Sequence, residues 1–373
     1  MNINSLIKAI KDTNITFYKP TKVELLVFDQ NGINTISPFL KKKYFILKTR
    51  GEEINLYVLI YLLINFKKIN YINYINSFIE LVNPKFIVHH SVNDKFFQIK
   101  KYFPKIITIF IQNQFLYDTE MKNIKKGICN YSFLWGRDDV KRFTDISINK
   151  PFLVGSVLNN SIKNLKIKYN KTPLFISQFR VQKSKYWKLN DNSFIEYDKL
   201  MEADKFALKL LSNYFKKKKQ NIFILCASKS KQKLAKEKEF YIENVPNNNI
   251  KFLSGNRTIF GYQKCKLFKK IFFINSTLGF ECLAQKKDCF FFNFKNKFVG
   301  FKYLKFPLSK NGSCWSDSLN EKILLKKIEE FMNNKSVKNF NKNNKKYYSR
   351  IIYYDYKNNI LKKNLRKIFK DYG

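Results

Sequence analysis

The sequence lacks the spacings of cysteine and histidine on which disulfide frameworks and metal sites depend. Its six cysteines include no Cys-x-x-Cys pair, and it contains only two histidines. It has no Asp-x-Asp, His-Glu-x-x-His, Walker A or Gly-x-Ser-x-Gly motif. We therefore expect reduced cysteines in the core of a cytosolic protein, and chemistry that uses neither a metal nor a bound cofactor.

Long apolar runs are also missing. The most apolar segment, Ile54–Phe66, has about 13 residues, whereas a bilayer-spanning helix needs about 20. We predict a buried helix there and no transmembrane segment. The first residues, Met1–Lys8, lack the apolar core of a signal peptide. We expect a cytoplasmic protein. Peripheral contact with the inner face of the membrane is compatible with this expectation.

Arginine is scarce although the chain is strongly basic. The net charge is +43, and only seven of the 71 basic residues are arginine. Lysine is enriched together with Asn, Ile, Phe and Tyr, which is typical of an AT-rich coding genome rather than of selection for a polyanion. The charge still favours anionic membrane surfaces or substrates. A nucleic-acid-binding protein is a less favoured alternative, because the arginines are scattered and most aromatics fall in predicted cores.

Short, continuously apolar runs alternate with helical patterns along most of the chain. Such runs are typical of parallel strands that are buried on both faces. The length of 373 residues suits two domains. We therefore predict an α/β protein with two doubly wound sheets. The predicted strands are Val23–Phe28, Tyr44–Leu47, Phe86–His90, Ile106–Ile111, Tyr131–Leu134 and Phe152–Val154, then Leu174–Ser177, Ile222–Cys226, Ile250–Phe252, Ile271–Asn275 and Cys289–Phe292.

The domain boundaries follow from composition. Residues 1–157 form the predicted N-terminal domain, a polar Asn- and Lys-rich stretch over 158–172 is the linker, and 173–335 form the second domain. Residues 336–373 remain as a Lys- and Asn-rich segment with a final helix. Ligands bind outside the carboxyl ends of parallel strands, so we expect a cleft between the two domains at those ends.

The segment Ile271–Gln285 carries the most information, because it predicts a buried strand running into a capped helix. Asn275 or Ser276 can cap that helix, and its free backbone N–H groups suit a phosphate. Gly279 would allow close approach of the phosphate, and Glu281 would accept hydrogen bonds from sugar hydroxyls. An ordinary capped helix explains the same pattern without any ligand.

A second polar turn follows the first strand of the second domain. Ser177 and Arg180 lie in that turn, and a guanidinium is well suited to clamp a diphosphate. Arg257, after another strand, is a weaker candidate. A surface ion pair is the ordinary explanation for Arg180.

The two histidines stand at the end of a predicted central strand. A neutral imidazole at His90 or His89 is a natural general base, with Asp94 or Asp29 orienting it or acting instead. Strand alternation places the two rings on opposite faces, so at most one can serve a given site. Two structurally satisfied histidines are an equally good explanation.

Gln112 and Asn113 end the neighbouring strand and would bind acceptor hydroxyls. Plain turn chemistry explains this pair as well. We take Gly136 and Gly155, each after a strand, as mainly structural turns.

With these pieces placed, the chain resembles the putative O-antigen, or surface carbohydrate, biosynthesis proteins, which look like GT-B-type glycosyltransferases. The similar stretches are His89–Asp94, Gln112-Asn113, Trp135-Gly136, Gly155-Ser156, Asn275–Ala284, Gly312 to Trp315, and the end around Asp355 and Asn359. Together they run from about residue 20 to 365.

The resemblance implies a metal-independent transferase with two Rossmann-like domains. Its nucleotide donor would lie on the second domain, with the phosphates at Ser276, Thr277, Leu278 and Gly279 and the hydroxyls at Glu281. The acceptor would meet the first domain. Gln114 stands where the family pattern leads us to expect Gly, which makes that turn less free to take positive φ.

The predicted activity is transfer of a sugar from a nucleotide-activated donor to a glycan or lipid-linked acceptor in surface polysaccharide (O-antigen, capsule or lipopolysaccharide) biosynthesis. A sugar-nucleotide epimerase of the same architecture is an alternative. A transferase of glycerophosphate or sialic type differs only in its donor, and a catalytically dead carbohydrate-binding relative also fits.

Overall fold

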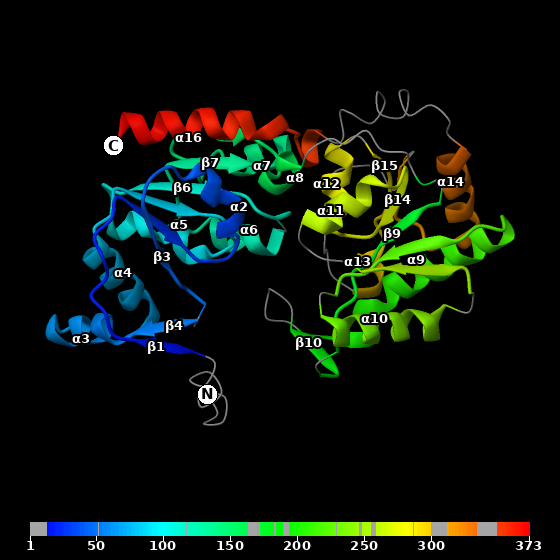
Figure 1. Ribbon diagram of the computed structural model, residues 1–373, viewed down its shortest axis with the longest axis horizontal. Helices are drawn as coiled ribbons and strands as arrows, with labels where there is room; N and C mark the ends of the chain where they lie inside the picture. The colour runs from blue at the N-terminus through cyan, green and yellow to red at the C-terminus, as the bar shows by residue number, and fades with distance from the viewer. Residues whose placement is uncertain are drawn as a thin grey trace. The chain divides into compact units, whose positions relative to one another are not determined.

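The computed structural model describes most of the chain, divided into two units. The described residues are 13–50, 52–116, 118–162, 170, 172–182, 184–188, 194–228, 230–245, 248–254, 259–285, 287–299, 312, 314–333 and 349–373. The N-terminal unit comprises residues 1–115, 121–157 and 355–373, and the C-terminal unit 116–120 and 158–354 (Figure 1). The cleft between the two predicted domains stays a prediction.

The N-terminal unit contains a six-stranded sheet in which every neighbouring pair is parallel. Its order is β3-β2-β5-β6-β7-β8. The sequence predicted all six strands, because each is a run of apolar residues. They are β2 (Leu25–Phe28), β3 (Tyr44–Leu47), β5 (Phe86–His89), β6 (Ile107–Ile111), β7 (Tyr131–Leu134) and β8 (Phe152–Leu153).

Both faces of this sheet are covered by helices. Leu25, Val88 and Ile111 point to one face, where they share a core cluster with residues of α2 (Ile33–Ile36) and α16 (Asn359–Asp371). The intervening residues point to the other face, which is aromatic: the Phe110 ring lies 5.1 Å from Phe97 and 5.5 Å from Phe143. Burial on both faces is why these strands read as continuous apolar runs.

The last helix, α16, belongs to the N-terminal unit. Leu361, Leu365, Ile368 and Phe369 are buried in its core cluster, and the Phe369 ring packs edge-on against Phe86 at 5.0 Å. The sequence analysis had left this helix in a separate terminal segment. Apolar residues spaced three and four apart dictate an amphipathic helix, but only the fold decides which sheet receives it.

The C-terminal unit repeats the architecture. Its six-stranded sheet has the order β13-β12-β9-β14-β15-β16, again with parallel neighbours. The strands are β9 (Leu174–Ile176), β12 (Ile222–Leu225), β13 (Ile250–Leu253), β14 (Lys270–Phe273), β15 (Asp288–Phe292) and β16 (Trp315–Ser316). The prediction of two doubly wound sheets is therefore confirmed, with β16 as an added edge strand.

The remaining elements are helices and two small sheets. The sheets pair β1 (Asn14–Thr16) with β4 (Glu53–Asn55) and β10 (Tyr186–Lys188) with β11 (Phe194–Glu196). The other helices are α3 (Leu56–Ile64), α4 (Tyr71–Val82), α5 (Asp94–Tyr102), α6 (Asp118–Ile124), α7 (Arg137–Arg142), α8 (Val157–Ser161), α9 (Tyr197–Lys217), α10 (Lys231–Asn244), α11 (Ile259–Lys266), α12 (Thr277–Ala284), α13 (Lys295–Val299) and α14 (Glu321–Asn333), with short 3₁₀ turns at Ser37–Phe39 and Tyr356–Asn358.

Two expectations about apolar residues have different outcomes. All six cysteines are buried thiols outside any disulfide bond, as predicted. The predicted burial of the apolar helix is wrong, because α3 buries Val58 and Leu62 but leaves Leu63 and Ile64 exposed. Among the described residues, no helix combines the length and the apolar character needed to cross a membrane.

Replacing Leu365 with Ala should destabilise the N-terminal unit by about 3 kcal/mol. The side chain is 1% exposed, and truncation would leave a cavity between α16 and the sheet. Urea unfolding followed by circular dichroism measures the change. Lys363→Ala, on the exposed face of the same helix, should alter the free energy of unfolding by less than about 0.5 kcal/mol. Equal effects of the two substitutions would contradict the packing described for α16.

Candidate functional site

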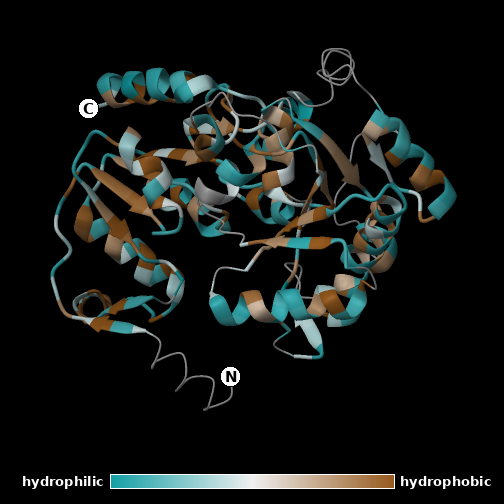
Figure 2. Cartoon of the chain, turned by 45° about the vertical axis from the view of Figure 1, so that its right-hand side comes forward, coloured by the Kyte–Doolittle hydropathy of each residue, from teal (hydrophilic) through white to brown (hydrophobic). Residues whose placement is uncertain are grey.

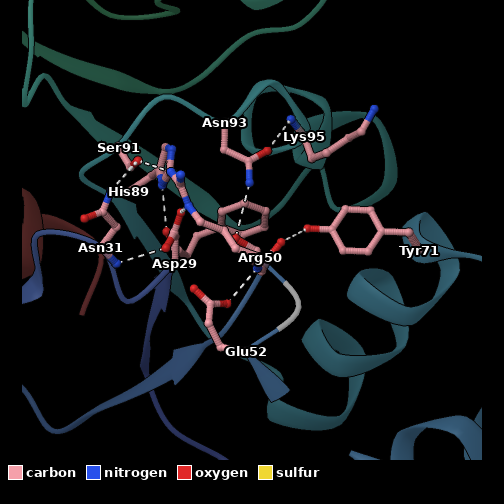
Figure 3. Close-up of polar contacts among 11 residues, drawn as sticks. Asp29, Asn31, Arg50, Glu52, Tyr71, His89, Ser91, Asn93 and Lys95 are labelled. Carbon is pink, nitrogen blue, oxygen red and sulfur yellow. Dashed lines mark hydrogen bonds and ion pairs between the residues drawn. The ribbon is translucent and has the colours of Figure 1, made fainter. Parts of the chain in front are cut away.

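In the N-terminal unit, polar side chains gather where β2, β3 and β5 end. Asp29 follows β2 directly and is 1% exposed, and its carboxylate accepts hydrogen bonds from Arg50 Nε at 2.6 Å and from the Asn31 backbone N–H at 2.9 Å (Figure 3). Arg50, after β3, also donates from Nη2 to the Ser91 hydroxyl, after β5. Asp29 has φ of 83°, a left-handed conformation that asparagine and aspartate tolerate better than most residues. The ends of three adjacent strands are thus tied together by one guanidinium.

In the Asp29–Arg50 ion pair, only the arginine is accessible to solvent. The side chain of Arg50 is 45% exposed, whereas that of Asp29 is fully buried. Asp29 therefore holds the guanidinium in place, and Arg50, rather than Asp29, is presented to solvent. The predicted acceptor-binding role of Asp29 becomes an indirect one.

His89 points into the aromatic face of the sheet. Its Nδ1 lies 2.6 Å from the Phe28 carbonyl, and its ring stacks on Phe96 at 4.9 Å. Because a carbonyl only accepts, Nδ1 carries the proton, and Nε2 is the buried nitrogen for which the described residues offer no hydrogen-bond partner. Burial lowers the pKa of His89 to about 4. A ring enclosed in this way gives no support to His89 as the catalytic base.

His90 points to the opposite face of the strand and lies against the turn after β2. Its Nδ1 is 2.9 Å from the Ile111 carbonyl, so Nε2 carries the free lone pair of the neutral ring. A Cβ built on Gly32, which has φ of 80°, would fall 2.8 Å from His90 Cδ2 and 3.6 Å from Nε2. Burial lowers the pKa of His90 to about 4. The imidazole is therefore a neutral base throughout the physiological range.

Gln112 is engaged within the fold. Its Nε2 donates to Asp139 Oδ2 at 2.9 Å, and its Oε1 accepts from the Trp135 backbone N–H at 2.7 Å. Burial raises the pKa of Asp139 to about 6, against the lowering effect of the nearby Arg142. These contacts tie β6 to β7 and α7, so the structure does not support Gln112 as an acceptor ligand.

Two further N-terminal candidates lie close by. Asn113, next to Gln112, keeps a buried Oδ1 without a hydrogen-bond partner among the described residues. Asp94 opens α5, four residues beyond His90, with 37% of its side chain exposed and Lys95 Nζ at 3.6 Å. Of the N-terminal candidates, the structure brings Asp29, His90 and Asn113 to three adjacent strand ends and leaves Asp94 at the edge of the group.

In the C-terminal unit, β14 leads into α12 as predicted. Ser276 occupies the N-cap position with an extended backbone, but no hydrogen bond is made by its side chain to the first turn of α12. Asn275 is 5% exposed, and its Oδ1 lacks a hydrogen-bond partner within the described part of the chain. Thr277 and Leu278, in the first turn, are half-buried. A helix N-terminus without a side-chain cap suits an anion.

Gly279 allows α12 to pack closely against β14. A Cβ at this position would lie 2.3 Å from Cγ and Cδ2 of Phe273, so only glycine lets α12 lie directly on β14. Glycine at a strand-to-helix junction commonly allows such close packing of the helix on the strand. The role predicted for Gly279 in the close approach of a phosphate stays a prediction.

Glu281 is buried in the same helix, 2% exposed. Its Oε2 accepts a hydrogen bond from the Tyr262 hydroxyl at 2.6 Å, and its backbone carbonyl accepts one from Asn159 Nδ2 at 3.1 Å. Burial and the carboxylate keep the Tyr262 pKa well above its usual value, so the hydroxyl remains a donor. The role predicted for Glu281 at donor hydroxyls stays a prediction.

Ser177 belongs to a buried network. Its hydroxyl donates to Glu237 Oε1 at 2.6 Å, lies 2.8 Å from the Tyr241 hydroxyl and accepts from the Phe179 backbone N–H at 3.0 Å. Glu237 also accepts from the backbone N–H groups that follow β12. Ser177 thus joins β9 to α10, and the structure does not support it as a donor ligand.

Arg180 is exposed and lies near a second cation, Lys295. Burial lowers the pKa of Lys295; the Asp204 carboxylate opposes this shift, and the Arg180 guanidinium adds to it. Asp204 is fully buried, and burial raises its pKa. Arg180, Ser276 and Lys295 follow β9, β14 and β15, which are neighbours in the sheet. The exposed Arg180 and the buried Lys295 thus follow the two strands on either side of β14, which leads into α12, and we call the ends of these three strands the cationic edge.

The sequence analysis missed Arg50 and Lys295. Each lies three residues beyond a correctly predicted strand, so the rule that singled out Arg180 would have found them. Lys295 was hidden by the abundance of lysine. Arg257, the weaker phosphate candidate, lies outside the described residues. Within the described ranges, no three His, Cys, Asp or Glu side chains form a possible metal site, and metal independence stays a prediction.

Comparison with known proteins identifies a family. Residues 107–369 match the family described as "putative O-antigen biosynthesis protein", which is more than half of the chain. No protein of curated function matches it in sequence.

Solved structures share the fold. A "putative UDP-N-acetylglucosamine 2-epimerase" from Listeria monocytogenes superimposes with a TM-score of 0.55 at 9% identity, covering 94% of this chain and 98% of its own. The Methanocaldococcus jannaschii UDP-GlcNAc 2-epimerase in complex with UDP-GlcNAc and UDP gives 0.52 at 12%, covering 94% and 100%. S. aureus MnaA with UDP gives 0.52 at 9%, covering 97% and 98%. The chain therefore has the GT-B-type, two-Rossmann-like architecture.

Acid should destabilise the protein partly through His89. Its pKa is about 4 in the folded state and about 6.5 when unfolded, so the unfolded state binds the proton first as the pH falls. The stability that neutral His89 contributes is complete above pH 6.5 and is lost towards pH 4. Between pH 7.5 and 5 this amounts to about 2 kcal/mol.

Urea unfolding of the wild type and His89→Gln at the two pH values tests this. The variant should lose about 2 kcal/mol less than the wild type over that interval, whatever its stability at pH 7.5. Identical pH dependences would contradict the buried, neutral state of His89.

Proposed function

The chain belongs to the family of putative O-antigen biosynthesis proteins, and from this we propose that it is a metal-independent glycosyltransferase. It would move a sugar from a nucleotide-activated donor to a glycan or lipid-linked acceptor in surface polysaccharide biosynthesis. The observation that carries the proposal is the cationic edge of the C-terminal unit.

The donor's diphosphate would bind at that edge. The backbone N–H groups of the first turn of α12 donate no hydrogen bond to the Ser276 side chain. Arg180 is exposed and follows β9, the strand next to β14 in the sheet. Lys295 adds a second positive charge near Arg180. In this proposal the helix N-terminus and the two cations stabilise the negative charge that develops on the leaving phosphate.

The acceptor would bind at the strand ends of the N-terminal unit. His90 Nε2 would take the proton of the acceptor hydroxyl, while Nδ1 stays hydrogen-bonded to the Ile111 carbonyl. The acceptor oxygen then bonds to the anomeric carbon of the sugar, and the bond from that carbon to the phosphate oxygen breaks. Arg50, held by Asp29, would orient an anionic or hydroxyl-rich acceptor.

The alternative is an epimerase that acts on the nucleotide sugar alone. Two of the superimposed structures carry this name, and one of these is a complex with UDP-GlcNAc and UDP, so UDP-GlcNAc is included among the candidate donors. Conversion of the sugar without any acceptor distinguishes epimerisation from transfer. A donor of glycerophosphate or sialic type would keep the same phosphate contacts.

Donor binding is tested by thermal shift with UDP-GlcNAc and with other UDP-, GDP-, CMP-, CDP- and dTDP-linked compounds. One donor at 100 times its Kd should stabilise the protein by about 2.7 kcal/mol. Arg180→Ala should weaken its affinity about tenfold or more, since a charge-assisted hydrogen bond contributes about 1.5–3 kcal/mol. Arg366→Ala, an exposed arginine on α16, is the matched control and should leave the affinity unchanged. Absence of stabilisation by every donor would overturn the proposal.

The base is tested by replacing each histidine. His90→Gln should lower the transfer rate about 100-fold or more with little change in donor affinity. His89→Gln, measured at pH 7.5 on folded protein, should retain most of the rate. Because the His90 pKa is about 4, wild-type turnover should be nearly constant above about pH 5.5 with respect to this group. Equal losses in the two variants would remove His90 from the mechanism.

A further inference from the structure

The N-terminal unit exposes a contiguous set of apolar side chains on α3 and the turn that follows it. Ile64 is 70% exposed and Phe66 98%, and Leu63 and Ile69 beside them are more than half exposed. Directly after β1, Phe17 is 67% exposed, and its ring lies 6.2 Å from that of Tyr57 in α3. Figure 2 shows α3 among the most hydrophobic parts of this unit. We call this set the α3 patch.

Helix α3 is apolar on two sides. Val58 and Leu62 are fully buried and hold the helix on the unit, so that Ile60, Leu63 and Ile64 face outward. No charged residue occurs from Ile54 to Phe66. Monomeric soluble proteins rarely expose contiguous apolar surface of this kind, so the patch points to a binding surface.

The form of the patch suits insertion into a surface. With nine residues, α3 is about 14 Å long, roughly half the hydrocarbon thickness of a bilayer, so it can lie in an interface but cannot span one. Phe66 has φ of 54°, an unfavourable left-handed conformation for an aromatic residue, and this turn projects its ring almost fully into solvent. Tyrosines 57, 61 and 71 flank the patch, as is typical at the level of lipid headgroups.

Charge distinguishes an anionic lipid surface from a second copy of the chain. Lys67 and Lys68 follow Phe66 immediately, and the whole chain carries a net charge of +43. Two copies brought together would repel each other, whereas a surface of anionic lipid attracts both the flanking lysines and the chain as a whole. Apolar side chains that insert while lysines contact headgroups are the pattern of interfacial helices.

We propose that the α3 patch docks the N-terminal unit on an anionic lipid surface, with Leu63, Ile64 and Phe66 inserted at the boundary of headgroups and acyl chains. Arg50 precedes α3 by six residues, which limits its distance from the start of the helix to about 20 Å. The strand ends that carry Arg50 therefore lie within about 20 Å of the start of α3 and in the same unit as the patch. A lipid-linked acceptor fits this placement, and that part of the inference rests on the proposed function.

Vesicle flotation tests the docking itself. The wild type should float with vesicles of phosphatidylglycerol and phosphatidylcholine, less with pure phosphatidylcholine, and less at high salt. The triple variant Leu63→Ser, Ile64→Ser, Phe66→Ser should lose at least about tenfold in partitioning. The control Ile148→Ser, Ile242→Ser, Phe194→Ser removes three similarly exposed apolar side chains elsewhere and should change partitioning less than about twofold.

The outcomes that would contradict lipid docking can be told apart. Failure of the wild type to float, or equal flotation of the triple variant, overturns the proposal. Sedimentation that shows a wild-type dimer, converted to monomer by the triple substitution and without flotation, assigns the patch to a second copy instead. Donor-induced thermal shifts should be the same in wild type and triple variant, so a failure of the lipid proposal is separable from a failure of the donor proposal. Circular dichroism confirms that the variants are folded.

Discussion

Burial of both parallel sheets on both faces is the constraint on which the rest of the structure depends. Helices and apolar strands fill the two faces of each sheet, so polar side chains can gather only at the strand ends. In a parallel sheet all carboxyl ends meet at one edge, where the loops also expose backbone groups. Asp29, Arg50 and His90 in one unit, and Arg180, Ser276 and Lys295 in the other, follow directly from that arrangement.

Most of the polar groups at these edges satisfy one another. Gln112 joins β6 to β7 and α7, and Ser177 joins β9 to α10 through Glu237. Such networks fix the positions of the strand ends, because an unpaired buried polar group is costly. Among the described residues, the groups at these edges that are open to a ligand include the exposed Arg50 and Arg180 and a helix N-terminus without a side-chain cap. This set selects for anionic substrates, in agreement with a nucleotide-activated donor.

The α3 patch differs from the rest of the described structure because several large apolar side chains are exposed together there. Most apolar residues elsewhere cover the sheets, and others, such as Ile148 and Ile242, are exposed singly. Ile64 and Phe66 are exposed together in the patch and cover nothing in the described structure. A lipid surface would give these side chains a function and would bring the polar strand ends of the same unit near it. Surface polysaccharides are assembled from components held at membranes in the lipid-linked case, so docking and transfer would support each other.

Local patterns in the sequence determined the elements of this fold. Continuous apolar runs identified the strands of both sheets, and the final helix, α16, was also predicted, because burial imposes characteristic spacings along the chain. The strand-to-helix junction at Ser276 was also visible. Tertiary structure alone decided the different surroundings of adjacent residues. It enclosed His89 among phenylalanines and placed His90 against Gly32. It also brought Gly279 against Phe273. It also paired Asp29 with Arg50, 21 residues apart in the chain, and turned half of an apolar helix outward. Those outcomes depend on which segments pack together, and no local pattern contains that information.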